Sequence, residues 1–298
     1  MQRIAITGGT GLIGSTLASR LDAAGHQVHV VTRSPKHASD IAWNPRLGEI
    51  DLEKLAGCEA VVHLAGESIF GRWTNRKKER IRTSRVQGTQ LLCESLARLE
   101  PRPAVLVCAS AVGYYGDRGD EILTEKSRPG DNFLGQVCQE WEAACEPARA
   151  AGIRVVNVRS GPVLSPCGGM LRTMLPLFKF GLGGRVASGR QWISWIGIDD
   201  EVDILLAAIE DDSLAGAINA TAPHPVTNGE FTRTLGRVLG RPTLLPVPRF
   251  GVKLALGSDG ADELALVSVR AQPARLLERG HEFRHSDLEA ALRELLER

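Results

Sequence analysis

The sequence predicts an α/β fold, a doubly wound parallel sheet followed by a smaller mixed subdomain at the C-terminal side. A glycine run at residues 8–14 separates a short apolar strand from an amphipathic helix. Apolar strands then alternate with helical patterns as far as residue 160, which is typical of a parallel sheet covered on both faces. Beyond Gly161 the chain is richer in glycine and its apolar segments are shorter.

Hydrophobic periodicity and helix-ending residues give the order of the elements. Strands are expected where apolar residues run together, at 3–7, 26–32, 60–66, 104–109 and 154–159. Helices are expected at 12–24, 51–55, 77–99, 133–150, 200–210, 229–239, 249–256 and 286–296. Residues 34–50 are expected to be irregular, and Asp199 or Asp200 is expected to cap the helix that follows.

Composition narrows the class of protein. At 298 residues the chain can bury a large core, and its net charge of +1 argues against a surface that binds polyanions. The basic run from Arg72 to Arg85 is explained by a solvated helix face. No apolar run is long enough for a membrane span, and the N-terminus enters a strand directly, so we expect a cytoplasmic protein without a signal peptide.

The six cysteines are scattered without C-x-x-C spacing, which predicts free thiols and no metal site. We expect a small-molecule ligand, no nucleic-acid or membrane partner, and a monomer or homodimer.

The glycine run carries the main functional signal. It matches G-x-G-x-x-G from Gly9 and G-x-x-G-x-x-G from Gly8. Such glycines allow a tight turn, let the backbone approach a pyrophosphate, and bring the helix N-terminus to the phosphates. An ordinary glycine-rich loop is the alternative, and the position directly after a strand disfavours it. The run therefore predicts a dinucleotide-binding Rossmann domain.

The end of the second strand indicates which dinucleotide is bound. An acidic residue there would hold the ribose hydroxyls of NAD, but the chain reads Thr32-Arg33-Ser34. Arg33 can pair with a 2′-phosphate, which favours NADP(H); the alternative is a solvated loop cation. We predict an NADP-binding domain over residues 1–164, to which 196–222 return, and a smaller substrate-side subdomain over 165–195 and 223–298.

Several segments in order resemble one family. They are the glycine turn, AVVHLAG at 60–66 with Glu67, Arg72-Trp73, Ser84-Arg85, SAVGYYG at 110–116, WEAA at 141–144, the Ile198-Asp199-Asp200 triplet and the ending at 273–292. Together they resemble the extended or atypical short-chain dehydrogenase/reductases. Within these, the chain is most similar to the "epimerase family" proteins that share a C-terminal domain of unknown function.

The resemblance implies a set of cofactor contacts. The residues implied are Gly8, Thr10, Gly11, Leu12, Ile13, Gly14, Thr32, Arg33, His63, Leu64, Arg85 and the backbone near Val163, and less firmly Lys78 or Glu79. His63 could instead be a satisfied strand-end residue, and Arg85 a cation on a helix surface.

The resemblance also implies a catalytic serine and a Tyr-x-x-x-Lys pair on the next helix, but here Phe133 and Val137 occupy the pair's positions. Ser110 remains at the strand end, with Tyr114 and Tyr115 just beyond it. Without a nearby cation a tyrosine keeps a pKa of ~10, which suits a proton donor at neutral pH. The alternative is that Tyr115 packs against the cofactor ribose or the sheet.

Two functions stay open from the sequence. The first is an NADP(H)-dependent oxidoreductase or epimerase that moves a hydride to or from a small carbonyl or alcohol compound. The second is a non-catalytic NADP(H)-binding sensor or regulatory protein, which the missing Tyr-x-x-x-Lys pair favours. Trp192 and Trp195 either wall a substrate pocket or pack in the core.

Overall fold

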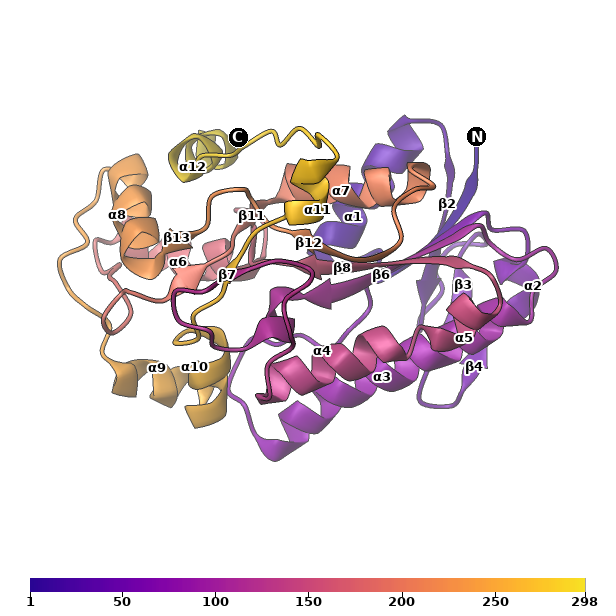
Figure 1. Cartoon of the computed structure of the whole chain (residues 1–298), viewed down its shortest axis with the longest axis horizontal. Helices are drawn as coiled ribbons and strands as arrows, with labels where there is room; N and C mark the ends of the chain where they lie inside the picture. Colours follow the sequence, from indigo (N-terminus) through magenta and orange to yellow (C-terminus); the bar gives the residue numbers. More distant parts are fainter. Residues whose placement is uncertain (298) are drawn as a thin grey trace.

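A central eight-stranded sheet organises the computed structural model, which describes residues 1–297 (Figure 1). The strand order is β12-β8-β6-β5-β1-β2-β3-β4, in which every neighbouring pair is parallel except β3 and β4. The strands are β1 (Arg3–Thr7), β2 (Gln27–Thr32), β3 (Ile41–Asn44), β4 (Glu49–Ile50), β5 (Ala60–His63), β6 (Val105–Ala111), β8 (Arg154–Ser160) and β12 (Gly216–Ala220). The predicted doubly wound sheet is confirmed.

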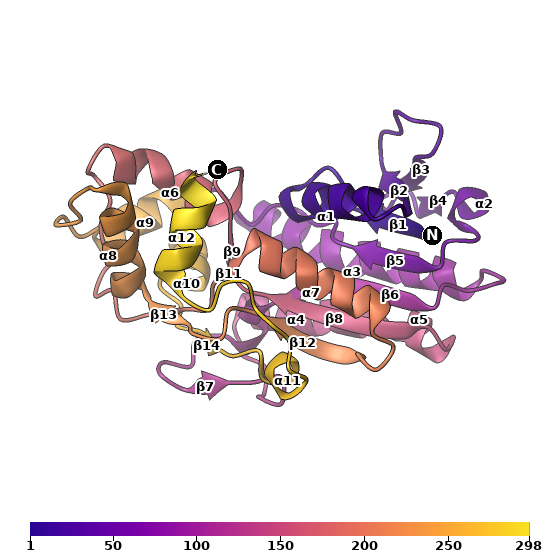
Figure 2. The same cartoon turned by 90° about the horizontal axis from the view of Figure 1, so that it is seen from above.

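Helices cover both faces of this sheet (Figures 1 and 2). One face carries α1 (Leu12–Ala23) and α7 (Ile198–Glu210), and the other carries α3 (Asn75–Ala97), α4 (Phe133–Ala143) and α5 (Glu146–Ala150). Each face of the sheet has its own hydrophobic core, and successive side chains of β1 point into one or the other. Ile4 and Ile6 pack on the α1 side, while Ala5 packs on the α3 side. The chain leaves β1 for β2 on one side and β5 lies on the other, so a crevice opens at the carboxyl ends of these strands.

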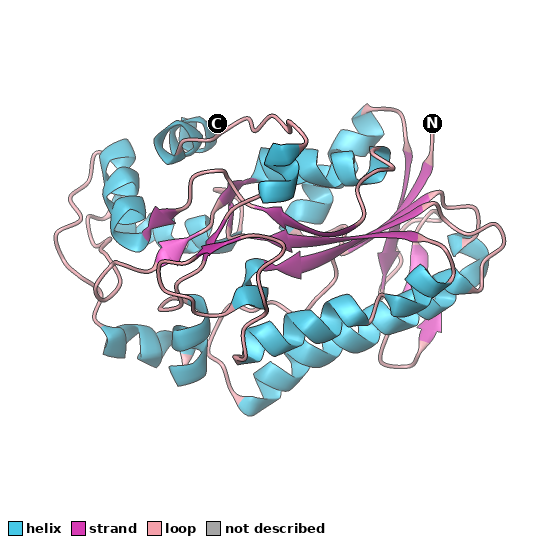
Figure 3. Ribbon diagram, in the orientation of Figure 1, coloured by secondary structure: helices cyan, strands magenta, loops and turns pink. Residues whose placement is uncertain are grey.

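Smaller elements gather at the carboxyl edge of the sheet (Figure 3). The helices there are α6 (Gly169–Lys179), α8 (Asn228–Leu239), α9 (Arg249–Leu256), α10 (Ser258–Leu264) and α12 (Leu288–Glu297). The short strands are β7 (Ile122–Leu123), β9 (Val163–Leu164), β10 (Trp192–Ile193), β11 (Ile196–Gly197), β13 (Val226–Thr227) and β14 (Arg270–Ala271). Two short helices, α2 (Leu52–Leu55) and α11 (Ala274–Glu278), and the 3-10 turn η1 (Val112–Tyr115) complete the fold.

The structure differs from the expected elements in several respects. The helix expected at 133–150 is broken, because Pro147 lies in the first turn of a second helix, α5. Residues 34–50 contain β3 and β4, which join the sheet edge, and β12 and α6 were not expected at all. The β12 segment reads GAINA, and α6 holds Pro176 in its interior, so local propensity predicts neither element.

Asp200 fixes the C-terminal segment and does not cap α7, which begins after Gly197. Its carboxylate accepts the backbone N–H groups of Arg284 (2.6 Å) and His285 (3.3 Å). Burial raises the pKa of this carboxyl. Among residues 1–297, no helix combines the length and the apolar character needed to cross a bilayer.

Candidate active site

The turn between β1 and α1 has no room for side chains at its key glycines. Gly8 has a φ of +70°, and a Cβ on it would lie 2.9 Å from the carbonyl carbon of Leu64. A Cβ on Gly14 would lie 2.3 Å from the carbonyl oxygen of Gly8, which also accepts the N–H of Gly11 at 2.9 Å. The glycines therefore let the turn fold back against β5, as a dinucleotide turn requires.

The N-terminus of α1 is open to a ligand. No side chain caps it at Gly11, and the first backbone hydrogen bond runs from Ser15 N to the Gly11 carbonyl. Within the described chain the N–H groups of Leu12 and Ile13 have no backbone acceptor, and Thr10 beside them is exposed. Unpaired N–H groups and the positive end of the helix dipole suit a pyrophosphate.

Arg33 lies directly after β2 at the same edge. Its side chain is exposed and makes no ion pair with residues 1–297. The neighbouring Thr32 hydroxyl accepts the Ser34 N–H at 3.3 Å, which shapes the loop. A free guanidinium at this position fits a 2′-phosphate.

His63 is fully buried and acts on the site indirectly, through Thr7 and the backbone of residues 64 and 65. Thr7 Oγ1 accepts the N–H groups of Leu64 and Ala65, both at 3.1 Å, so its own proton is donated to His63 Nδ1 at 2.7 Å. His63 Nε2 must then donate to Thr89 Oγ1 at 2.9 Å. Burial lowers the pKa of His63 to about 4, so the ring is neutral at pH 7. Its two hydrogen bonds fix Thr7, which in turn holds the backbone beside the glycine turn.

Arg85 supports the loop that follows β5. Its Nη1 donates to the carbonyls of Glu67 (3.0 Å) and Ile81 (3.3 Å), and the guanidinium lies 4.9 Å from the centroid of the Trp141 ring. A Cβ on Gly66 would lie 3.3 Å from Arg85 Cζ. Through these contacts the Arg85 side chain fixes the backbone of residues 66 and 67.

Val163 lies close to the glycine turn through the start of α6. A Cβ on Gly168 would lie 3.0 Å from Leu12 Cδ2, and one on Gly169 would lie 3.1 Å from the Val163 carbonyl oxygen. β9, which contains Val163, pairs with β11. The structure therefore brings the turn, Val163 and the N-terminus of α6 together at the carboxyl edge.

No ionisable side chain occupies the two positions on α4 where the resemblance implies tyrosine and lysine. Phe133 packs edge-on against Trp73, with ring centroids 5.6 Å apart, and Val137 is buried. Lys78 Nζ lies 4.9 Å from the Phe133 centroid but is ion-paired with Asp259 at 2.7 Å.

A buried ionic network lies beneath the predicted catalytic residues. Arg159 on β8 and Glu142 on α4 form two parallel hydrogen bonds of 2.8 Å. Ser110 donates to the same carboxylate at 2.7 Å. Tyr115 donates to Asn219 Oδ1 at 2.7 Å and accepts from Arg159 Nη1 at 3.1 Å. The hydroxyls of Ser110 and Tyr115 are thus both bound to protein groups.

Tyr114 differs from Tyr115. It is half-buried, and within residues 1–297 its hydroxyl makes no hydrogen bond. The Arg159 guanidinium lies 3.4 Å from the centroid of its ring, and the Tyr115 ring packs edge-on at 5.3 Å. Tyr114 is therefore held through its ring while its hydroxyl is free.

The expectation of a tyrosine without a nearby cation is wrong, because Arg159 contacts both rings. Burial raises the pKa of Tyr115 to about 12, above the value expected from the sequence. Sequence reasoning missed Arg159 and Glu142. The available signal was an arginine near the end of a valine-rich strand that is expected to be buried, since a buried charge needs a partner.

The two tryptophans near residue 194 differ in burial. Trp195 is fully buried and donates to the His224 carbonyl, whereas half-buried Trp192 donates to Asp120 at 2.7 Å. All six cysteines are free thiols, and only Cys167 is exposed. The described part of the chain contains no side-chain cluster that could hold a metal ion.

The fold and the site define an extended dinucleotide-binding α/β protein, with an open glycine turn and a C-terminal subdomain over the carboxyl edge of its sheet. Comparison with known proteins agrees with this class. Residues 4–220 match the model of the NAD dependent epimerase/dehydratase family, and residues 247–295 match a domain of unknown function, DUF1731. The chain belongs to the NAD dependent epimerase/dehydratase family.

Relatives match over nearly the whole chain. An epimerase family protein of Mycobacterium bovis is 45% identical over 291 residues, which are 97% of this chain and 96% of the relative. The crystal structure of human epimerase family protein SDR39U1 with NADPH is 35% identical, with a TM-score of 0.91 and 99% of each chain covered. A nucleoside-diphosphate sugar epimerase of Corynebacterium glutamicum is 41% identical with a TM-score of 0.82; the match covers 99% of this chain and 58% of that one.

Proposed function

We propose that this protein is an NADP(H)-dependent oxidoreductase, or an epimerase that works through a transient ketone, acting on a small carbonyl or alcohol compound. The observation that carries the proposal is the uncapped N-terminus of α1 behind a sterically enforced glycine turn, with a free arginine after β2. The NADPH in the crystal structure of human SDR39U1, which shares this fold, supports the choice of cofactor.

The chain's own residues have separate tasks in this proposal. The N–H groups of Leu12 and Ile13 bind the pyrophosphate, and Arg33 binds the 2′-phosphate. The backbone near Val163 and Leu64 borders the cofactor, and His63 and Arg85 keep that backbone in place. The nicotinamide, when bound, supplies the hydride chemistry at its C4 atom.

Tyr114 is our candidate for the proton donor. A hydride acceptor becomes an alkoxide and needs a proton, and a positioned phenol can supply it. Of the three predicted catalytic residues, only Tyr114 has a hydroxyl that is not bound to protein groups within residues 1–297. Ser110 and Tyr115 are positioning residues for Tyr114. Both are hydrogen-bonded to the Arg159–Glu142 pair, and Arg159 contacts the Tyr114 ring.

A second function is favoured by one specific observation. Phe133 and Val137 leave α4 without a proton-transferring group where the resemblance implies tyrosine and lysine. A protein that binds NADP(H) without turnover would tolerate this loss. In that case the protein would report the redox state of the cofactor to a partner.

Cofactor binding is tested first by titrating the purified protein, stripped of cofactor, with NADPH and NADH and following nicotinamide fluorescence. We expect NADPH to bind at least tenfold more tightly, and Arg33→Ala to abolish most of that preference. Arg98→Ala is the matched control, because Arg98 is also an exposed arginine and lies at the C-terminal end of α3. Failure of both nucleotides to bind would refute the proposal and its alternative together.

Catalysis is tested by a screen of small carbonyl compounds that follows NADPH oxidation. Turnover that Tyr114→Phe abolishes, with NADPH affinity unchanged, supports the oxidoreductase. Tight NADPH binding without turnover on any compound of the screen would favour the sensor.

A further inference from the structure

A ridge of exposed apolar side chains lies at one end of the molecule, in the C-terminal subdomain. Its members come from the end of α6 and the loop after it, from the loop before α9, and from α9 itself. They are Phe180, Leu182, Leu244, Leu245, Phe250 and Leu254, which are between 57% and 86% exposed. Figures 1 and 2 both place α6, α8 and α9 at this end of the molecule. We call these six side chains the apolar ridge.

The two loops that carry the ridge run side by side. Val186 and Val247 form a parallel β-bridge, although they are far apart in the sequence. A Cβ on Gly184 would lie 1.6 Å from the carbonyl oxygen of Leu245, so the two backbones are in direct contact there. The loop after α6 and the loop before α9 therefore form one continuous surface.

Helix α9 extends this surface. Phe250 and Leu254 are four residues apart and therefore lie on the same face of the helix, which is exposed. Val252 is the buried residue of α9. The helix thus presents an apolar face to solvent, with Arg249 and Lys253 next to it in the sequence.

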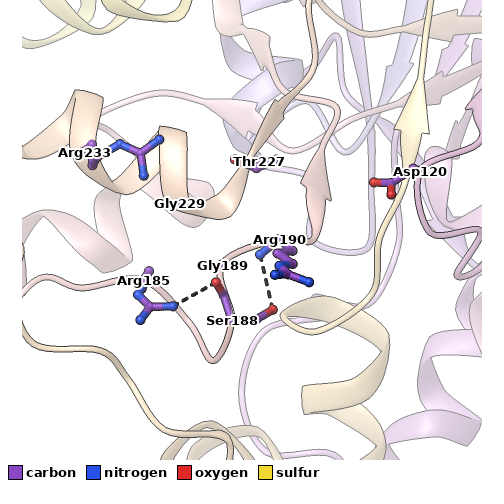
Figure 4. A pocket seen from close by; sticks show the side chains of 8 residues that line it. All are labelled: Asp120, Arg185, Ser188, Gly189, Arg190, Thr227, Gly229 and Arg233. Carbon is purple, nitrogen blue, oxygen red and sulfur yellow. Dashed lines mark hydrogen bonds between the residues drawn. The ribbon is translucent and has the colours of Figure 1, made fainter.

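The chain around the ridge is basic and has no acidic residue. Residues 169–190 hold four lysines or arginines and residues 231–258 hold five, whereas neither stretch contains aspartate or glutamate. Three of these cations line the cavity in Figure 4. Lys179, Arg241 and Arg249 make no ion pair with any residue that the structure describes. Positive charge is therefore concentrated here, in a chain whose net charge is only +1.

Acidic side chains on the neighbouring helix α10 do not cancel this charge. Asp259 pairs with Lys78 at 2.7 Å, and Asp262 pairs with Lys253 at 3.2 Å. Glu263 accepts the backbone N–H of Phe133 at 2.9 Å. Lys253 is thus the one cation beside the ridge on α9 that has an acidic partner in the described chain.

The charge of the ridge indicates which kind of surface can cover it. A second copy of the chain would bring like charges together across a symmetric contact, which opposes association. A bilayer with anionic lipids offers an apolar interior under a negatively charged surface. Basic residues beside exposed Phe and Leu side chains are typical of helices that lie in such an interface.

The shape of the ridge also suits a bilayer. Phe180 and Leu244 are 82% and 86% exposed, so they project from the protein and do not line a groove. Projecting apolar side chains can enter the boundary between headgroups and acyl chains without a complementary pocket.

We propose that the apolar ridge binds peripherally to membrane surfaces that contain anionic phospholipids. The six apolar side chains enter the boundary between headgroups and acyl chains, and Lys179, Arg241 and Arg249 contact the headgroup phosphates. The sequence favoured no membrane partner because no segment is long enough to span a bilayer. Peripheral binding needs no span, and it uses side chains from segments that only the fold brings together.

The test is flotation of the purified full-length protein with lipid vesicles. One set is an equal mixture of phosphatidylcholine and phosphatidylserine, and the other is phosphatidylcholine alone. Phe180→Ser/Leu244→Ser removes the two most exposed side chains of the ridge. The matched control is Leu47→Ser/Leu277→Ser, which changes exposed leucines outside the ridge. Thermal unfolding of each protein is measured in parallel.

A second pair of variants tests the charge. Lys179→Gln/Arg241→Gln removes two cations beside the ridge, and Arg46→Gln/Arg98→Gln removes two exposed arginines elsewhere. Exposed cations without partners contribute little to stability, so this comparison still decides the proposal if the apolar variant unfolds.

We expect the wild type to bind the mixed vesicles at least tenfold more tightly than phosphatidylcholine alone, and to be released as the salt concentration rises. Both ridge variants should bind the mixed vesicles at least tenfold more weakly, and both controls should stay within twofold of the wild type. Equal binding to the two kinds of vesicle, equal weakening in ridge and control variants, or no binding by the wild type would overturn the proposal.

Sedimentation of the same proteins without lipid tests the other occupant. A wild-type dimer that Phe180→Ser/Leu244→Ser dissociates, without binding to vesicles, would assign the ridge to contact between copies and overturn the proposal. NADPH affinity should be the same in all variants, since none of them changes the glycine turn or Arg33. The result for the ridge is therefore independent of the proposed function.

Discussion

Arg159 and Glu142 form a bidentate ion pair inside the protein, with two N–O distances of 2.8 Å. Their side chains are only 4% and 14% exposed, so water screens the pair weakly. Arg159 comes from β8 and Glu142 from α4, and the pair positions Ser110, Tyr114 and Tyr115 through direct contacts. The geometry of the candidate active site thus depends on one charged contact between a strand and a helix.

Removal of one partner of this pair should be costly. Glu142→Ala leaves the Arg159 charge buried without a carboxylate, and we expect a loss of about 3 kcal/mol in the free energy of unfolding, measured by urea denaturation. The double variant Glu142→Leu/Arg159→Met should lose less than either single variant, because it leaves no buried charge. A cost below about 1 kcal/mol for Glu142→Ala would mean that the pair is effectively solvated.

The two tyrosines should respond differently to loss of the hydroxyl. Tyr115→Phe removes the partner of Asn219 and Arg159 in the core, and we expect about 1–3 kcal/mol of destabilisation in thermal or urea unfolding. Tyr114→Phe removes a hydroxyl without protein partners, so its stability and NADPH affinity should match the wild type while turnover is lost. Full activity of Tyr114→Phe on an identified substrate would refute its role as proton donor.

The glycine turn should not tolerate a methyl group at Gly14. A Cβ there would meet backbone atoms of Gly8 and Gly9 at 2.3 Å and 2.9 Å, and backbone cannot move aside as a side chain can. We expect Gly14→Ala to weaken NADPH binding at least tenfold in the fluorescence titration, or to lower the unfolding temperature by several degrees. Ser15→Ala, one position along on the exposed side of α1, is the control and should leave both quantities unchanged.

Sequence reasoning succeeded where the determinants are local. The turn at 8–14, the strand before it and the helix after it are contiguous, so periodicity and glycine placement define them together. Arg33 is a candidate for the same reason, because it follows β2 directly, and its contact with the cofactor stays a prediction.

The sequence did not reveal the contacts between distant residues. Ser110, Glu142 and Arg159 come from a strand, a helix and another strand. The cavity in Figure 4 is likewise lined by residues from separate segments, among them Arg185, Arg190 and Arg233. No local pattern brings such residues together. The role of His63 likewise depends on Thr7 and Thr89, which only the folded sheet places beside it.

Glu201 gives the fold a pH dependence that can be measured. Its side chain is buried in the first turn of α7, where Oε1 accepts the Ser160 hydroxyl at 2.6 Å and Oε2 has no hydrogen-bond partner among residues 1–297. Burial raises the pKa of this carboxyl from 4.5 to about 7. The folded protein therefore holds the proton more tightly than the unfolded chain does.

A raised carboxyl pKa makes the stability fall as the pH rises. Below pH 4.5 Glu201 is protonated in both the folded and the unfolded state, so it does not lower the free energy of unfolding. Between pH 4.5 and about 7 only the unfolded chain ionises, and the free energy of unfolding falls. Above about pH 7 the full loss of stability is present. Glu201→Gln keeps the shape without the charge, so it should be more stable than the wild type at pH 8, by up to about 3 kcal/mol, and nearly equal at pH 4.5. Urea unfolding at both pH values measures this difference. Glu49→Gln, at an exposed position of β4, is the control. A gain for Glu201→Gln that is the same at both pH values would show that the Glu201 carboxyl keeps its ordinary pKa.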